Sequence, residues 1–142
     1  MSKAEPSELS PKRAHQLLQD DPRAVLVDIR STMEFVFVGH PTGAVHVAWI
    51  DEPDWDINPH FVPEIRKLLL GGAVCDTLEG CAPVILICRS GKRSAEAGRV
   101  LLEAGLKGVY HIDAGFEGDL DDHHQRGNVG GWRFHGLPWE QC

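Results

Sequence analysis

One cysteine, Cys88, stands immediately before a short stretch in which Arg89, Lys92 and Arg93 surround Gly91. The thiolate is the nucleophilic form of cysteine, and only a minor fraction of a free cysteine is ionised at neutral pH. Cations within a few residues, together with the N–H groups and dipole of a following helix, stabilise the ionised sulfur. The amides of such a loop also form a concave nest for an anion. The stretch therefore predicts a nucleophilic cysteine that attacks an anionic, electrophilic substrate.

The flanking segments indicate how this cysteine is positioned. The apolar run of residues 84–87 predicts a buried strand that ends at Cys88. Ser94 then begins a run of helix formers, residues 95–104, which Gly105 closes. A strand, a tight loop and a helix place the loop at the carboxyl edge of a parallel sheet, where ligands bind in open α/β folds. A buried, inert cysteine is the alternative, but three adjacent cations cannot be buried cheaply.

The rest of the chain alternates between helical and strand patterns. Helices are predicted after Ser10, an N-cap followed by Pro11, and around the apolar positions of residues 61–69. Ser31 can cap a short helix through Glu34 and Phe35. The β-branched and apolar content of residues 24–29, 44–48 and 108–112 predicts further strands. Residues 1–8 read as a flexible polar tail and residues 9–142 as a single domain.

Bulk composition excludes several classes of function. The chain has 142 residues, 14 Lys and Arg against 21 Asp and Glu, and therefore a net charge of −7. Such an acidic chain is a poor candidate for binding nucleic acid or an anionic membrane. The N-terminus lacks the apolar core of a signal peptide, and no apolar run is long enough for a membrane span. We expect a cytoplasmic protein with reduced thiols.

The remaining cysteines and the histidines suggest no metal site. Cys75, Cys81 and Cys142 show no C-x-x-C spacing and are interpreted as bystanders. Three histidines near the end of the chain, His123, His124 and His135, lack cysteine or carboxylate partners at a recognised ligand spacing. We expect no metal and no cofactor.

Two motifs resemble the rhodanese family of single-domain sulfurtransferases. The run from Cys88 to Ser94, CRSGKRS, is similar to the active-site loop of that family. Upstream, the segments VLVDIR (residues 25–30), Glu34-Phe35, Gly39-His40 and GAV (residues 43–45) resemble its N-terminal signature. The resemblance runs from about residue 9 to residue 139. The chain departs from the family pattern at Ala114-Gly115, where many members have two glycines, and in an insertion over residues 119–131.

The resemblance implies an α/β fold with a central, mostly parallel sheet of five strands and helices on both faces. It also implies ping-pong sulfur transfer. The Cys88 thiolate attacks the sulfane sulfur of thiosulfate or a related persulfide donor, and the resulting Cys88 persulfide passes sulfur to cyanide, a small thiol or a protein thiol. In this hypothesis the loop residues bind the substrate: Arg89, Ser90, Gly91, Lys92 and Arg93. Asp28, Arg30 and Ser94 support the site.

Two other functions remain open at this point. Cysteine phosphatases and arsenate reductases also use a thiolate in an anion-binding loop, with C-x5-R spacing. Here the spacing from Cys88 to Arg93 is C-x4-R, and the shorter loop makes a smaller cradle that suits a bare sulfur better than a tetrahedral oxyanion. A sulfur-relay module without turnover of its own would use the same residues as the enzyme.

Overall fold

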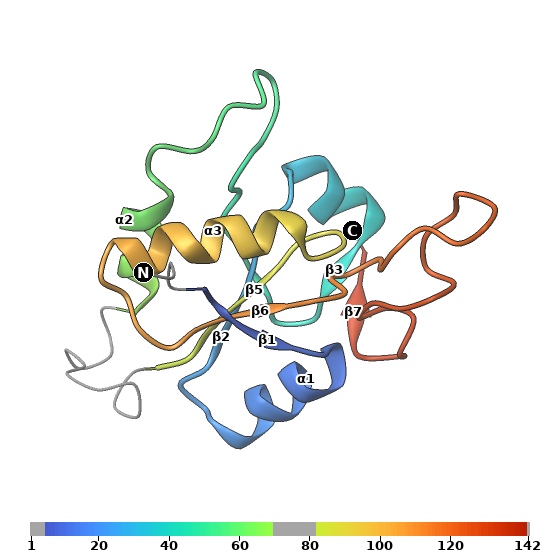
Figure 1. Cartoon of the computed structure of the whole chain (residues 1–142), viewed down its shortest axis with the longest axis horizontal. Helices are drawn as coiled ribbons and strands as arrows, with labels where there is room; N and C mark the ends of the chain where they lie inside the picture. The colour runs from blue at the N-terminus through green and yellow to red at the C-terminus, as the bar shows by residue number, and fades with distance from the viewer. Residues whose placement is uncertain (1–4, 70–81, 142) are drawn as a thin grey trace.

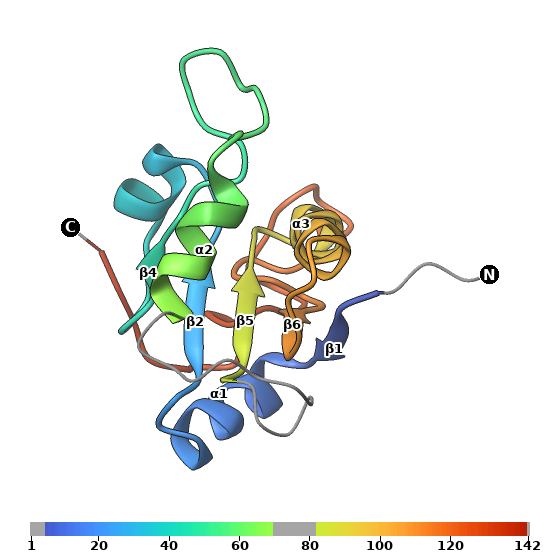
Figure 2. The same cartoon turned by 90° about the vertical axis from the view of Figure 1, so that its left-hand side faces the viewer.

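The computed structural model describes residues 5–69 and 82–141. Its centre is a five-stranded sheet in the order β1-β6-β5-β2-β4, and all neighbouring strands in it are parallel (Figure 2). These strands are β1 (Ser7–Leu9), β2 (Val25–Asp28), β4 (Val45–His46), β5 (Val84–Ile87) and β6 (Val109–Ile112). A second sheet pairs β3 (His40–Pro41) antiparallel to β7 (Trp139–Glu140). The expected parallel five-stranded α/β fold is confirmed.

Helices cover both faces of the sheet, as expected. They are α1 (Pro11–Asp20), α2 (Phe61–Leu69) and α3 (Lys92–Glu103), with a five-residue π-helix, η1 (Glu34–Val38). Figure 1 shows α1 and α3 on opposite sides of the strands. The side chains of β5 alternate accordingly: Val84 and Leu86 face the core under α2 and α3, whereas Ile85 and Ile87 face the core under α1.

Strand β5 lies in the middle of the sheet and carries the candidate nucleophile at its end. All four of its residues are fully buried, which explains their uninterrupted apolar character. Its register pairs Ile87 with Asp28 of β2, so the two strands end at the same level. Cys88 and the residues after Asp28 therefore emerge at one edge of the sheet, the carboxyl edge.

Two side-chain caps begin helical segments where the sequence predicted them. The Ser10 hydroxyl accepts a hydrogen bond from the Arg13 N–H at 3.2 Å, and Pro11 is the first helical residue of α1. The Ser31 hydroxyl accepts from the Glu34 N–H at 3.3 Å, while the Glu34 carboxylate accepts from the Ser31 N–H at 3.3 Å. This reciprocal pair is a capping box, and it fixes Glu34 at the rim of the carboxyl edge.

Some element boundaries differ from the prediction. Residues 1–8 were predicted as a flexible tail, but Ser7–Leu9 form the edge strand β1 beside β6. The segment was missed because its residues are mostly exposed and polar, so it carries no apolar pattern. Helix α3 begins at Lys92 rather than Ser94, because Gly91 adopts the left-handed conformation that starts the helix two residues earlier. Among the described residues, no helix has the length and apolar character needed to cross a membrane.

Candidate active site

The Cys88 sulfur lies inside its own loop and accepts hydrogen bonds from the backbone. The Gly91 N–H donates to Sγ at 3.1 Å and the Ser94 N–H donates at 3.4 Å. The thiol in turn donates to the Ser94 hydroxyl at 3.4 Å. Cys88 is only 1% exposed, so these groups rather than water solvate the sulfur. The loop thus forms a small cradle of N–H donors around one sulfur atom, suited to a negative charge on that atom.

The cradle is held from behind by the turn that follows β6. The Phe116 N–H donates to the Cys88 carbonyl at 2.8 Å, and the Glu117 N–H donates to the Arg89 carbonyl at 2.9 Å. Two glycines permit this close approach. A Cβ on Gly91 would lie 2.1 Å from the Asp113 carbonyl oxygen, and one on Gly115 would lie 2.5 Å from the backbone of residues 88 and 89. Both have positive φ, of 102° and 64°.

The three loop cations differ in their surroundings. Arg89 and Lys92 are exposed, and neither belongs to an ion pair with any residue of ranges 5–69 and 82–141. Arg93 is instead engaged by Glu34 in a bidentate pair with N–O distances of 3.0 and 3.1 Å. Burial alone raises the pKa of Glu34, but the hydrogen bonds and charge of Arg93 outweigh it and hold this pKa below its ordinary value.

The ion pair lowers the pKa of Glu34 and raises the pKa of Arg93. Burial lowers it, but the Glu34 hydrogen bonds and the charges of Glu34, Cys88 and Asp28 raise it above its ordinary value. Arg93 therefore remains charged, and its charge is paired with the Glu34 carboxylate. The local positive field over Cys88 is weaker than a count of three cations indicates, because Glu34 neutralises one of them.

Asp28 and Arg30 form a fully buried ion pair beside the loop. Arg30 Nε and Nη2 contact the Asp28 carboxylate at 2.9 and 2.6 Å, and Nη2 also donates to the Gly39 carbonyl. The guanidinium lies over the Phe116 ring, 4.5 Å from its centroid. Through Phe116 this pair supports the turn that holds the Cys88 loop. The supporting role of both residues in the reaction stays a prediction.

The structure adds His111 of β6, which sequence reasoning did not select. Its Nδ1 lies 3.0 Å from the Ser94 hydroxyl oxygen, and the ring is almost fully buried. Burial lowers the pKa of His111, partly offset by nearby carboxylates, so the ring is neutral at neutral pH. A histidine in an otherwise apolar strand was a usable signal, but no spacing links it to Ser94, 17 residues away.

Within the described residues, two tryptophans and one histidine make no hydrogen bond or ion pair with the Cys88 loop. Trp49 is 3% exposed and packs edge-on against Phe61, whereas Trp55 is 55% exposed on the loop that follows β4. The His40 ring lies between two acceptors: its Nδ1 is 2.9 Å from the Phe35 carbonyl oxygen and its Nε2 is 3.2 Å from the Glu140 carboxylate. Cys75, Cys81 and Cys142 fall outside the described residues. Within the described ranges, no group of three or more metal-ligating side chains is placed to hold an ion.

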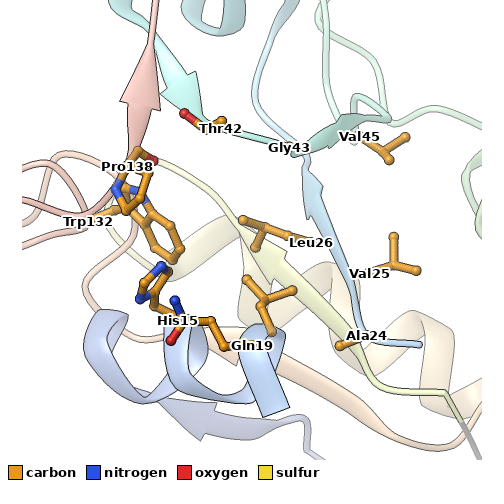
Figure 3. A pocket seen from close by; sticks show the side chains of 11 residues that line it. His15, Gln19, Ala24, Val25, Leu26, Thr42, Gly43, Val45, Trp132 and Pro138 are labelled. Atoms are coloured by element: carbon orange, nitrogen blue, oxygen red, sulfur yellow. The ribbon is translucent and has the colours of Figure 1, made fainter. Parts of the chain in front are cut away.

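A cavity of about 510 Å³ lies between α1, β2 and the C-terminal segment (Figure 3). Its wall includes His15 and Gln19 of α1, Leu26, Thr42 and the Trp132 ring. No residue of the Cys88 loop lines it. It is therefore separate from the candidate active site, which is a cradle around the sulfur rather than a deep pocket.

The chain belongs to the rhodanese-like domain family, whose pattern matches residues 10–121. This match includes the Cys88 loop, Asp28, Arg30, Glu34 and His111. It covers most of the chain and agrees with the parallel five-stranded fold described above.

Named relatives are consistent with this membership. The chain is 30% identical over 111 residues to the thiosulfate sulfurtransferase GlpE of Haemophilus influenzae, covering 78% of this chain and 85% of that protein. The crystal structure of Rv0390 from M. tuberculosis superposes with a TM-score of 0.80 at 39% identity, covering 99% and 100% of the two chains. The polysulfide-sulfur transferase homodimer of Wolinella succinogenes superposes with a TM-score of 0.60 at 25% identity, covering 96% and 80%.

Proposed function

We propose that this protein is a sulfurtransferase that carries sulfane sulfur as a Cys88 persulfide. The observation that supports this most is the pair of N–H donors, from Gly91 and Ser94, that point at the Cys88 sulfur. The same donors can hold the terminal sulfur of a persulfide anion, which needs charge stabilisation without a large pocket. The thiosulfate sulfurtransferase and polysulfide-sulfur transferase among the relatives support the same chemistry.

The proposed reaction proceeds in two half-reactions. The Cys88 thiolate attacks the sulfane sulfur of thiosulfate or a persulfide donor, forming a new S–S bond. The donor's own S–S bond breaks, and its electron pair leaves with sulfite or with the donor thiolate. A nucleophilic acceptor, such as cyanide, a small thiol or a protein thiol, then attacks the outer sulfur and releases the Cys88 thiolate. One sulfur atom thus passes from the donor to Cys88 and from Cys88 to the acceptor, and no cofactor takes part.

The loop residues have distinct proposed roles. The exposed cations Arg89 and Lys92 attract the anionic donor, since their charges are not paired within the described residues. Ser90 and Gly91 shape the cradle, and Arg93 bridges the loop to Glu34. The four residues between Cys88 and Arg93 leave a ring sized for one sulfur atom, which argues for sulfur transfer over phosphate-ester hydrolysis. We place this chemistry in the cytoplasm, where thiols are kept reduced.

Replacement of the nucleophile tests the proposal. Cys88→Ser should abolish thiosulfate:cyanide sulfurtransferase activity without unfolding the protein, because a serine hydroxyl stays protonated and cannot hold persulfide sulfur. Cys75→Ser and Cys81→Ser are matched controls that remove a thiol elsewhere and should leave most of the activity. Wild-type turnover by the Cys88→Ser variant would show that the reaction does not pass through this residue.

A further inference from the structure

Two hydrogen-bonded side chains, Ser94 and His111, lead from the buried Cys88 sulfur towards the exposed carboxylate of Glu8. The thiol donates to Ser94 Oγ at 3.4 Å, and Ser94 Oγ lies 3.0 Å from His111 Nδ1. On the far side of the ring, His111 Nε2 lies 4.0 Å from the carboxylate of Glu8, whose side chain is 71% exposed. This route connects α3, β6 and β1 across residues far apart in the sequence.

The buried position of Cys88 favours such a route. Only the thiolate attacks a sulfur donor, so the thiol proton must leave before the reaction. With 1% of the residue exposed, water has almost no access to the sulfur. Of its hydrogen-bond partners, the Gly91 and Ser94 N–H groups are donors and cannot accept a proton. Among the residues that the structure describes, the Ser94 hydroxyl is the one partner of the sulfur that can both accept and donate.

We propose that His111 is a positioning residue for Cys88, which takes up the thiol proton through the Ser94 hydroxyl. This inference rests on the proposed function only in treating Cys88 as the nucleophile. In the step, the Sγ–H bond of Cys88 and the Oγ–H bond of Ser94 break, while a new Oγ–H bond and an Nδ1–H bond form. One proton moves from Cys88 to His111, no electrons are transferred, and the products are a thiolate and an imidazolium.

The geometry after proton transfer also favours the thiolate. The protonated Nδ1 donates to Ser94 Oγ, which directs the Ser94 hydroxyl hydrogen at Sγ. The sulfur then accepts from three donors: the Gly91 N–H, the Ser94 N–H and the Ser94 hydroxyl. Hydrogen bonds to an ionised group are stronger than those to a neutral one. The relay therefore removes the proton and adds a donor to the resulting anion.

One competing arrangement would give Ser94 a purely structural role. Its hydroxyl carries a single hydrogen, and the Gly91 carbonyl lies within reach at 3.2 Å. If the hydroxyl donated permanently to that carbonyl, no proton could pass to His111. The contact with His111 Nδ1, at 3.0 Å, is the shorter of the two, which favours the relay.

The surroundings of His111 suit a group that gains and loses a proton. Burial lowers the pKa of His111, so that the ring is neutral and its Nδ1 is free to accept. The carboxylates of Glu8, Asp113 and Glu5 act in the opposite direction and favour the imidazolium once it forms, whereas Arg99 of α3 opposes it. The nearby Glu8 offers an exposed acceptor for release of the proton on the Nε2 side.

The test measures thiolate formation directly, without any sulfur donor. The rate at which iodoacetamide alkylates Cys88 is followed against pH by mass spectrometry of the Cys88 peptide. In His111→Asn, the side-chain amide can still hydrogen-bond Ser94 but cannot take up a proton. The midpoint of the alkylation profile should rise by about one pH unit, a tenfold slower rate below the midpoint, with the same rate at high pH. His15→Asn, a half-buried histidine on α1, is the matched control and should not move the profile.

A second variant tests the middle of the relay. Ser94→Ala should raise the midpoint of the alkylation profile at least as far as His111→Asn does. Ser94→Thr, which retains the hydroxyl, should keep the midpoint at its wild-type value. Because the two residues act in series, His111→Asn should add nothing to Ser94→Ala. An unchanged midpoint in His111→Asn or in Ser94→Ala, or additive shifts in the double variant, would overturn the relay. Alkylation does not depend on sulfur transfer, so these results stand apart from those for the proposed function.

Discussion

The ion pair between Arg93 and Glu34 makes the effect of removing Arg93 depend on whether Glu34 remains. The two side chains are only 24% and 21% exposed and share two contacts of 3.0 and 3.1 Å. Arg93→Ala leaves a partly buried carboxylate without its partner, next to the loop that we propose receives an anionic donor. The double variant Arg93→Ala/Glu34→Gln removes both charges, and its glutamine can still accept from Ser31. We therefore expect the single variant to be worse than the double.

The magnitude follows from the geometry of the pair. Exposed ion pairs contribute about 0.2–1 kcal/mol, and hydrogen bonds to charged groups about 1.5–3 kcal/mol. Since a fifth to a quarter of each side chain is exposed, we take a coupling of about 1.5 kcal/mol, between these ranges. Arg93→Ala should then lower the free energy of unfolding by about 2 kcal/mol. It should also raise the KM for thiosulfate about tenfold, equivalent to about 1.4 kcal/mol.

In the double variant most of this loss should be recovered. Its KM for thiosulfate should stay within about threefold of the wild-type value, and its stability should exceed that of Arg93→Ala. Steady-state thiosulfate:cyanide kinetics give the KM, and urea unfolding gives the stability of all four members of the cycle, with Glu34→Gln as the fourth. A double variant with a KM as high as that of Arg93→Ala would refute this reasoning, because the Arg93 charge would then act on the donor independently of Glu34.

Two further predictions concern Gly91, in the Cys88 loop, and Asp51, in the segment after β4. Gly91→Ala should destabilise the protein and lower activity far more than Gly105→Ala: both glycines have positive φ, 102° and 94°, but only at Gly91 does a Cβ meet a carbonyl oxygen, that of Asp113. Equal losses of thermal stability in the two variants would mean that the positive φ, rather than the contact of the new Cβ, determines the loss. Although burial raises the pKa of Asp51, hydrogen bonds from Glu52 and Thr32 lower it to about 2. The pKa of Asp51 is thus lower in the folded than in the unfolded protein. Its contribution to the stability of the fold is therefore complete above the unfolded pKa and is lost as the pH falls through about 2. Asp51→Asn should therefore cost about 1 kcal/mol at neutral pH, the scale of a hydrogen bond to a partly exposed charged group. Urea unfolding at decreasing pH should show this difference from wild type shrinking only under acid conditions, and a constant difference would contradict the reasoning.

The central part of the site could be predicted from sequence because its residues are neighbours in the chain. Four apolar residues, a cysteine, a glycine and a helix-forming run fix a strand, a loop and a helix by local preferences alone. The capping residues Ser10 and Ser31 were likewise recognised from local spacing. Each of these signals depends on contacts within a few residues.

What the sequence did not reveal depends on contacts between distant residues. Arg93 meets Glu34 across 59 positions and Ser94 meets His111 across 17. Sequence periodicity predicts neither contact, because each forms only when the sheet brings separate strands and loops to one edge. Strand β1 was missed for a related reason: an exposed edge strand gains its order from backbone pairing with β6, not from an apolar pattern.

The most direct test of the proposed chemistry is the intact mass of the protein after brief exposure to thiosulfate. Wild-type protein should gain the mass of one sulfur atom, peptide mapping should locate it on Cys88, and addition of cyanide should remove it. The Cys88→Ser variant, treated in the same way, should gain nothing. Absence of the added sulfur from wild-type protein with reduced thiols, or its location on another cysteine, would contradict the account.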